Sequence, residues 1–355
     1  MWIASCSKLV TSIAVLQCVE RGLFDLDSTA DVGRLLPEWC HPKILAGFEE
    51  GRPVLTNATK KITLRTLLSH TSGLAYDFLS PTLLEWRQSQ GEGSLAMSTP
   101  ITECFTHPLL FEPGTGWAYG PGLDVAGLMV ARANDCTLEQ YMRKYIFDPL
   151  GMNVTSFRPR TVAGLEERLM PMTYRPSPEE ALTNKYVPNA GLHTLPLDPV
   201  DEFGGAGLFG SAEDYLKLLK SLLRNDGKLL KPESMDALFI SAIDSSSEAE
   251  LCSTLSNPNY APIMIPGEAL VGSPTSGRWT HGLGSLIGLT ENDTGLKAPR
   301  LQWGGAPNLK WWIDRAGGSC GIFATQLMPA GETNHVELYN IFRCEMVKKF
   351  GGTCA

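Results

Sequence analysis

The 355-residue sequence lacks several features that would decide its class. No apolar run approaches the roughly 18 residues that a membrane-spanning helix needs. Basic residues are not in excess, because 30 Lys and Arg face 38 Asp and Glu, a formal net charge of −8. We therefore expect neither nucleic acid nor a membrane among its partners, since both attract basic surfaces.

Cysteines and histidines with metal-ligand spacing are also missing. The 9 Cys include no C-x-x-C, and the 6 His include no H-x-x-x-H. An odd number of cysteines without an export signal predicts free thiols in a reducing compartment, and so a cytoplasmic protein. We expect no metal site and no dissociable organic cofactor.

The N-terminal stretch Met1–Cys18 is apolar but has no basic segment ahead of it, and Lys8 interrupts it. We interpret it as an amphipathic helix rather than as a signal peptide. The composition, 43% hydrophobic and 19% charged, can bury a sizeable core. The length suits two domains, or one large domain with an insertion.

Apolar spacing and turn residues predict the elements of secondary structure. Helices are expected over residues 5–21, 62–69 (capped by Thr63), 122–133, 138–147, 213–223 and 338–350, and strands over 282–289, 311–314 and 319–327. Residues 165–200 are rich in proline and polar residues and predict a long ordered loop. Late antiparallel strands beside helices favour an α+β architecture over a doubly wound parallel sheet.

The tetrapeptide from Ser5 to Lys8 is an S-x-x-K at the start of the first predicted helix. Residues three apart share a helix face, so Ser5 and Lys8 are neighbours, whereas Ser7 points elsewhere. A serine hydroxyl becomes a nucleophile when a base takes its proton, and a buried lysine can be that base. Taken alone, the motif also fits an ordinary helix start.

Two further motifs carry candidate chemistry. Tyr119 ends a Gly- and Pro-rich loop just before a helix, where its phenol can move protons or simply pack under the loop. Trp303-Gly304-Gly305, placed between two predicted strands, either forms a plain tight turn or lets a substrate approach the backbone. A backbone N–H there can join that of Ser5 in an oxyanion hole.

In this order, the three motifs resemble those of the serine β-lactamase and penicillin-binding-protein-like superfamily. Further segments are similar to its class C esterase branch, and above all to the fungal transesterases of polyketide biosynthesis: Leu64–Leu74, Phe111–Gly114, Gly204–Phe209 and Trp303–Gly305. The resemblance covers essentially the whole chain. It implies a β-lactamase-like fold, an α/β sandwich with an antiparallel sheet and an inserted helical lobe.

The resemblance also implies roles for single residues. Ser5 is the acylated nucleophile, Lys8 its base and Tyr119 the second proton-transfer group. Ala306 supplies the oxyanion-hole N–H beside that of Ser5, next to the substrate-binding residues Gly305 and Trp303. Tyr76 falls where the family lines its acyl pocket, although core packing explains it equally well. For His70 a structural role is favoured.

Some positions depart from the family pattern. Tyr119 is followed by Gly120 and Pro121 instead of completing Y-x-N, and Trp303 replaces the lysine of K-T-G. Both changes argue against a β-lactam and for an ester or thioester. The late loop around Met328 carries no tryptophan, which leaves the acyl-donor preference open.

We expect one catalytic domain over residues 1–355. A mostly helical lobe would cover approximately 30–200, and residues 1–29 with 201–355 would form the α/β lobe. Relatives carry a helix and the first strands of the sheet ahead of the nucleophile, so we expect those N-terminal strands to be missing here.

Three hypotheses follow. The first is an acyltransferase that moves an acyl group from an acyl carrier protein or acyl-coenzyme A, through acyl-Ser5, to a hydroxyl of a polyketide-like small molecule. The second is a carboxylesterase in which water takes that acyl group. The third is a truncated, non-catalytic remnant. We expect a monomer.

Overall fold

The structure is a computed structural model that describes residues 1–95, 97–175, 187–188, 196–265, 278–292 and 295–350. Its α-helices are α1 (Ser7–Glu20), α2 (Thr29–Leu35), α3 (Leu64–Leu68), α4 (Pro81–Ser89), α5 (Ile101–Cys104), α6 (Gly122–Ala133), α7 (Leu138–Met142), α8 (Asp148–Leu150), α10 (Ala212–Arg224), α11 (Pro232–Ala237), α12 (Ser245–Ser256), α13 (Ala261–Met264) and α14 (Thr333–Phe350). Its strands are β1 (Lys43–Glu49), β2 (Arg52–Asn57), β3 (Thr173–Tyr174), β4 (Val187–Pro188), β5 (Trp279–His281), β6 (Leu286–Gly288), β7 (Arg300–Gly305), β8 (Leu309–Asp314), β9 (Ser319–Phe323) and β10 (Leu327–Met328).

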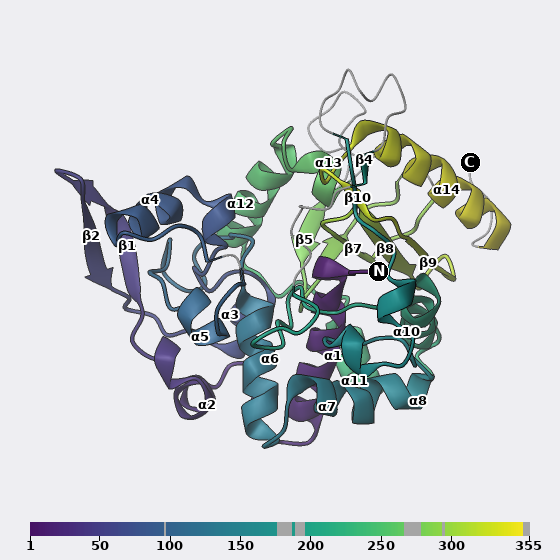
Figure 1. The fold of residues 1–355 in the computed structure, drawn as a ribbon, viewed down its shortest axis with the longest axis horizontal. Helices are drawn as coiled ribbons and strands as arrows, with labels where there is room; N and C mark the ends of the chain where they lie inside the picture. Colours follow the sequence, from purple (N-terminus) through teal and green to yellow (C-terminus); the bar gives the residue numbers. More distant parts are fainter. Residues whose placement is uncertain (96, 176–186, 189–195, 266–277, 293–294, 351–355) are drawn as a thin grey trace.

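Helix α1 runs through the middle of the molecule, between α6 and the sheet (Figure 1). Residues Ser7–Cys18 are all buried, so the prediction of an amphipathic helix was wrong. Polar side chains on this helix find internal partners instead of water. Thr11 donates a hydrogen bond of 2.6 Å to the Gly204 carbonyl, and Gln17 donates one of 2.9 Å to the Leu229 carbonyl.

The central sheet is a five-stranded antiparallel meander in the order β5-β6-β7-β8-β9. This confirms the α+β class and the late antiparallel strands. Two of these strands, β5 and β7, were not predicted, and Trp303–Gly305 lies within β7 rather than between strands. The glycine pair favoured a turn locally, but Gly304 and Gly305 pair with Lys310 and Leu309 of β8.

Helices cover both faces of the sheet. Successive residues of a strand point to opposite faces, and on β8 Trp311 meets Tyr215 of α10 while Trp312 meets Tyr339 of α14. Helices α10 and α14 therefore pack on opposite faces. Lys310, two residues before Trp312, lies on the face that α14 covers.

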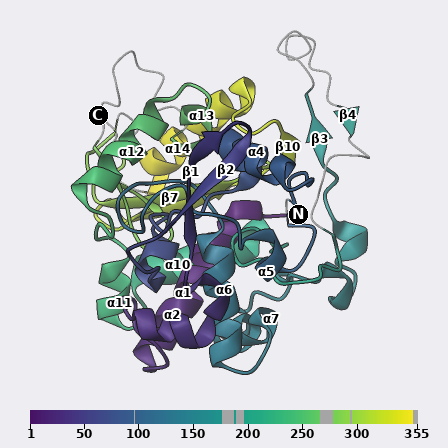
Figure 2. The ribbon, with the colours of Figure 1, turned by 90° about the vertical axis from the view of Figure 1, so that its left-hand side faces the viewer.

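The hairpin of β1 and β2 was also missed by the sequence analysis. Its burial is low, and its turn at Glu50 and Gly51 has positive φ angles of 50° and 76°, as tight hairpins require. Figure 2 views the molecule from the side of this hairpin. The loop predicted over 165–200 holds the short strands β3 and β4, while 176–186 and 189–195 lie outside the described residues.

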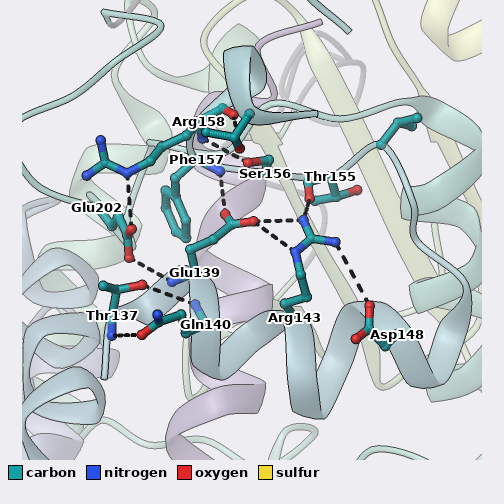
Figure 3. Close-up of polar contacts among 12 residues, drawn as sticks. Thr137, Glu139, Gln140, Arg143, Asp148, Thr155, Ser156, Phe157, Arg158 and Glu202 are labelled. Atoms are coloured by element: carbon teal, nitrogen blue, oxygen red, sulfur yellow. Dashed lines mark hydrogen bonds and ion pairs between the residues drawn. The ribbon is translucent and has the colours of Figure 1, made fainter. Parts of the chain in front are cut away.

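A network of hydrogen bonds connects α7 to residues 157–158 and to Glu202 (Figure 3). The Glu139 carboxylate accepts hydrogen bonds of 2.7 Å from Arg143 and from the Phe157 amide. The Glu139 amide in turn donates to Glu202 over 2.7 Å, and Arg158 donates to Glu202 over 3.4 Å. The network thus anchors the chain just before the glycine-rich segment Gly204–Gly207.

Other predictions concern thiols, membranes and lobes. Every described cysteine is a free thiol, as predicted, and Cys354 lies outside the described residues. Over the described part of the chain, no helix is long and apolar enough to cross a membrane. The division into lobes at about residues 30 and 200 stays a prediction.

Candidate active site

Ser5 lies in a 3₁₀ turn, Ala4–Cys6, that leads directly into α1. Ala4 is buried with a φ of 46°, a left-handed conformation that costs an alanine roughly 1–2 kcal/mol. Long-range backbone contacts hold this turn: the Ile3 amide donates to the Leu208 carbonyl over 3.0 Å, and Gly305 packs against Ile3. The strained turn is thus fixed from outside the helix.

The Ser5 hydroxyl meets both predicted proton-transfer groups. Tyr119 donates a hydrogen bond of 2.5 Å to Ser5 Oγ, and Lys8 Nζ donates one of 3.3 Å. The neighbouring Ser7 points away, as predicted, because its hydroxyl donates to the Ala4 carbonyl and accepts from the Leu208 amide. The geometry therefore assembles serine, lysine and tyrosine from two distant parts of the chain.

Behind Ser5, Nζ of Lys8 is fully buried and hydrogen bonded. It donates to the Gly205 carbonyl over 2.8 Å and to the Tyr76 hydroxyl over 3.2 Å. Tyr76 therefore hydrogen bonds to the lysine directly. Neither lining the acyl pocket nor packing in the core would require this contact. Its hydroxyl donates onward to Asp124 Oδ2 over 2.9 Å.

Asp124 is a site residue that the sequence analysis missed. It lies in the first turn of α6, is fully buried and accepts a hydrogen bond of 2.8 Å from the Gly205 amide. Burial raises the pKa of its carboxyl group, and the positive charge of Lys8 acts in the opposite direction. Burial and Asp124 together raise the pKa of Tyr76 well above its ordinary value, so Tyr76 stays a neutral donor. The sequence signal that could have identified Asp124 is the presence of an acidic residue just after the Tyr119 loop.

The segment that begins at His70 places the Tyr119 loop. The Ala118 amide donates to the His70 carbonyl over 3.0 Å, and the Tyr76 amide donates to the Tyr119 carbonyl over 3.4 Å. A side chain at Gly120 would place its Cβ 2.2 Å from the Leu74 carbonyl oxygen. Only glycine therefore permits this close approach of the two loops.

His70 supports Tyr119 from behind without touching Ser5. Its ring lies 5.0 Å from that of Tyr119 and 5.2 Å from that of His281, centroid to centroid. Burial, together with the nearby His281, lowers the pKa of His70 well below its ordinary value, so the ring stays neutral. These contacts agree with the structural role that the sequence favoured.

The end of β7 closes the site opposite Tyr119. The Trp303 ring lies 5.4 Å from the Tyr119 ring. At Gly305 a Cβ would lie 2.5 Å from the Ile3 carbonyl oxygen, so the strand end and the Ser5 turn pack backbone to backbone. Ala306, the first residue after β7, therefore lies beside the turn that carries Ser5, as an oxyanion-hole role requires.

A cavity of about 460 Å³ opens onto Ser5. Six predicted residues line it: Ser5, Tyr76, Tyr119, Trp303, Gly305 and Ala306. Most of the remaining lining is apolar, and it includes Trp2, Phe78, Leu79, Met97, Leu110, Trp117, Ile263 and Met264. Such a cavity suits a largely apolar small molecule. Within the described part of the chain, no group of His, Cys, Asp and Glu could hold a metal ion.

Comparisons with known proteins agree with this architecture. The chain is 37% identical over 352 residues to a lovastatin esterase of Penicillium rubens, covering 99% of this chain and 85% of the esterase. It is also 37% identical over 330 residues to a monacolin J acid methylbutanoyltransferase of Aspergillus terreus, covering 92% of this chain and 76% of the transferase.

Solved structures show the same relationship. The LovD9 mutant of simvastatin synthase from Aspergillus terreus superposes with a TM-score of 0.85 and 35% identity, covering 98% of this chain and 84% of that one. The hydrolase EstCE1, which has promiscuous acyltransferase activity, shares the fold with a TM-score of 0.68 at 21% identity. The Beta-lactamase family matches residues 1–343. With the fold, the relatives and this match in agreement, the chain belongs to the Beta-lactamase family.

Proposed function

We propose that this protein is a serine acyltransferase that moves an acyl group from a thioester, through acyl-Ser5, to a hydroxyl of a polyketide-like small molecule. The observation that carries the proposal is the double contact of Ser5 Oγ with Tyr119 at 2.5 Å and Lys8 at 3.3 Å. Relatives named as acyltransferases and esterases support it. The assembled contacts also favour an enzyme over a non-catalytic remnant.

In the first half-reaction, Ser5 Oγ attacks the thioester carbonyl carbon. Its proton passes to the unprotonated Nζ of Lys8 in the Lys8–Tyr119 pair, and the carbonyl oxygen gains negative charge beside the amides of Ser5 and Ala306. When the carbon–sulfur bond breaks, the thiolate leaves and takes up that proton. The products are acyl-Ser5 and a free thiol.

The second half-reaction runs the same steps in reverse. The acceptor hydroxyl gives its proton to the Lys8–Tyr119 pair and attacks the carbonyl carbon of acyl-Ser5. The ester bond to Ser5 Oγ then breaks, and the serine regains a proton. The largely apolar cavity favours an apolar acceptor over bulk water, and ping-pong kinetics follow from the covalent intermediate.

Acylation of Ser5 is tested by intact-protein mass spectrometry after exposure to butyryl-N-acetylcysteamine, a short activated thioester. We expect a mass gain of one butyryl group that is absent in Ser5→Ala. Ser12→Ala is the matched control, because Ser12 lies on α1, which follows the Ser5 turn, and its buried hydroxyl has no described partner. No adduct on folded protein, or an adduct that persists in Ser5→Ala, would overturn the proposal.

Hydrolysis is the second candidate, favoured by the relative named as a lovastatin esterase. Both reactions share acyl-Ser5 and differ in what removes the acyl group. An apolar secondary alcohol offered with the thioester distinguishes them. Transfer predicts that the new ester exceeds the free acid at millimolar alcohol, whereas acid as the main product at every alcohol concentration identifies an esterase.

The proposal also includes the identity of the acyl donor. An acyl carrier protein or acyl-coenzyme A would present the thioester at the cavity mouth. Exposed apolar side chains at that mouth, Phe78 and Leu79, offer a surface for a donor to approach. Equal rates with the free pantetheine thioester and with the carrier-bound one would argue against a carrier-protein donor.

A further inference from the structure

His70 follows helix α3 and has a backbone conformation that histidine rarely adopts. It is buried, with 1% of its surface exposed, and its φ angle of 61° lies in the left-handed region. A residue with a side chain keeps this conformation only where surrounding contacts hold it, and such residues gather at functional sites. The ring of His70 lies 5.0 Å from that of Tyr119, whose hydroxyl donates to Ser5 Oγ. The strained residue is thus next to a group that the reaction uses.

Two hydrogen bonds connect His70 to the residues on either side of Tyr119. The Ala118 amide donates to the His70 carbonyl over 3.0 Å, and the Gly120 amide donates to Nδ1 of the His70 ring over 3.3 Å. The first bond uses only the backbone, whereas the second needs an acceptor at the position of Nδ1. His70 therefore fixes the chain both before and after Tyr119, and one of these two links depends on its side chain.

The bond to Gly120 also fixes where the imidazole carries its proton. A backbone N–H can only donate, so Nδ1 of His70 is unprotonated and the proton of the neutral ring lies on Nε2. His281, the last residue of β5, has the opposite tautomer, because its Nδ1 lies 2.8 Å from the Gly282 carbonyl oxygen, which can only accept. An imidazolium at His70 would present an N–H to the Gly120 N–H, and that hydrogen bond would be lost.

The surroundings of His70 keep its ring neutral at pH 7. Among the described residues, the titratable groups that face it are His281 of β5, Lys8 of α1 and Tyr119 of the adjacent loop. Burial, His281 and Lys8 all lower the pKa of His70 well below its ordinary value. Burial also lowers the pKa of His281 to about 4, so that ring stays neutral as well. The acceptor at Nδ1 of His70 is therefore available at neutral pH.

From these contacts we infer that His70 is a positioning residue for the reaction: its neutral ring, through Nδ1 and the Gly120 amide, holds the Tyr119 loop so that the tyrosine hydroxyl stays on Ser5 Oγ. The inference rests on the proposed function, in which Tyr119 takes part in proton transfer. A displaced hydroxyl slows that transfer, because it needs a short and directed contact. His70 is not among the described residues that line the cavity, so substrate binding should be retained.

Two substitutions at His70 separate the acceptor from the rest of the ring. Asparagine places Oδ1 where Nδ1 lies and tolerates a left-handed backbone, whereas glycine tolerates the same backbone but offers no acceptor. On p-nitrophenyl butyrate, we expect His70→Gly to lower kcat by about 10–100-fold and His70→Asn to keep it within about threefold of the parent. KM should change less than about threefold in both variants. His107→Asn, which removes another buried imidazole, is the control and should keep both constants.

Melting curves establish that each variant is folded before its kinetics are compared. Equal losses of kcat in the two His70 variants would mean that the acceptor has no part in catalysis, and would overturn the inference. A folded His70→Gly with the kcat of the parent, or an effect on KM alone, would overturn it as well.

The tautomer is measured without catalysis and in the unaltered protein. Nuclear magnetic resonance of protein that carries isotopically labelled histidine reports which ring nitrogen holds the proton. We expect the His70 ring, identified by the signals that disappear in His70→Asn, to carry a proton on Nε2 and none on Nδ1 at pH 7. A proton on Nδ1 would contradict the inference, even if His70→Gly failed to fold. The expected tautomer in a parent protein that forms no acyl-Ser5 would instead reject the proposed function alone.

Discussion

At the scale of single residues, the site depends on the Lys8 side-chain nitrogen and the Tyr119 hydroxyl, which converge on the Ser5 hydroxyl oxygen. Ser5 and Lys8 come together through helix geometry, because they are three residues apart. Tyr119 comes from 114 residues away and approaches to 2.5 Å. Removing one group at a time should therefore separate chemistry from binding.

Tyr119→Phe removes the hydroxyl but keeps the ring against Trp303 and His70. We expect kcat to fall by about 10²–10⁴-fold, the usual contribution of a proton-transfer group, while KM changes less than about threefold. Steady-state kinetics on p-nitrophenyl butyrate measure both. Tyr145→Phe, on the turn after α7, serves as control. Activity within threefold of the parent would exclude proton transfer by Tyr119.

Lys310→Met should stabilise the protein at pH 7. Folding lowers the pKa of Lys310 from 10.5 to about 8, so the folded state holds this proton less tightly than the unfolded chain. The resulting penalty is complete below pH 8 and fades as the pH rises toward 10.5. Urea unfolding should show a gain of roughly 1–3 kcal/mol at pH 7 and a smaller gain at pH 9.5. A loss at pH 7 would mean that the charge is compensated.

At the scale of elements, loops rather than helices bring the site together. The Tyr119 loop is hydrogen bonded to the segment after His70, and Gly205 lies between Lys8 and Asp124. A Cβ at Gly205 would be 2.4 Å from Asp124 Oδ2. The glycine-rich motif Gly204–Gly207 therefore serves close backbone packing, which a sequence pattern suggests without naming the partner.

Glu139 anchors the chain ahead of that motif (Figure 3). Glu139→Ala removes two acceptor oxygens and leaves Arg143 and the Phe157 amide without this partner. We expect the free energy of unfolding to fall by roughly 1–3 kcal/mol. Chemical denaturation measures it, with Glu345→Ala, whose carboxylate forms an exposed ion pair, as the control. Equal losses of unfolding free energy in both variants would show that the Glu139 network stabilises the protein no more than an exposed ion pair does.

At the scale of the whole molecule, the Ser5 turn, the Tyr119 loop and the end of β7 contribute to the lining of a largely apolar cavity of about 460 Å³. A molecule that fills it binds the folded state alone and so stabilises it. At ten times its Kd, an apolar ester should raise the Tm of Ser5→Ala by about 1–4 °C. Differential scanning fluorimetry measures this shift. No shift at saturation, as judged by calorimetric titration, would mean that the ester binds the unfolded chain as tightly as the folded state, which contradicts binding in a preformed cavity.

Local sequence alone determined much of this protein. Spacing of three residues paired Ser5 with Lys8, and Thr63 capped α3 as predicted, with its hydroxyl accepting from the Thr66 amide. The late antiparallel strands were also found, because their turns carry glycine and proline. These features depend on neighbours in the chain, which local patterns record.

Tertiary structure decided the rest, because burial and strand pairing join residues that lie far apart in the chain. Other elements pack around α1 on all sides, so its polar residues are buried. An amphipathic helix, as expected from the sequence, would have exposed them to solvent. Pairing with β8 drew Gly304 and Gly305 into a strand. The links from Lys8 through Tyr76 to Asp124, and the arrival of Lys310 at the cavity, exist only once the chain is folded.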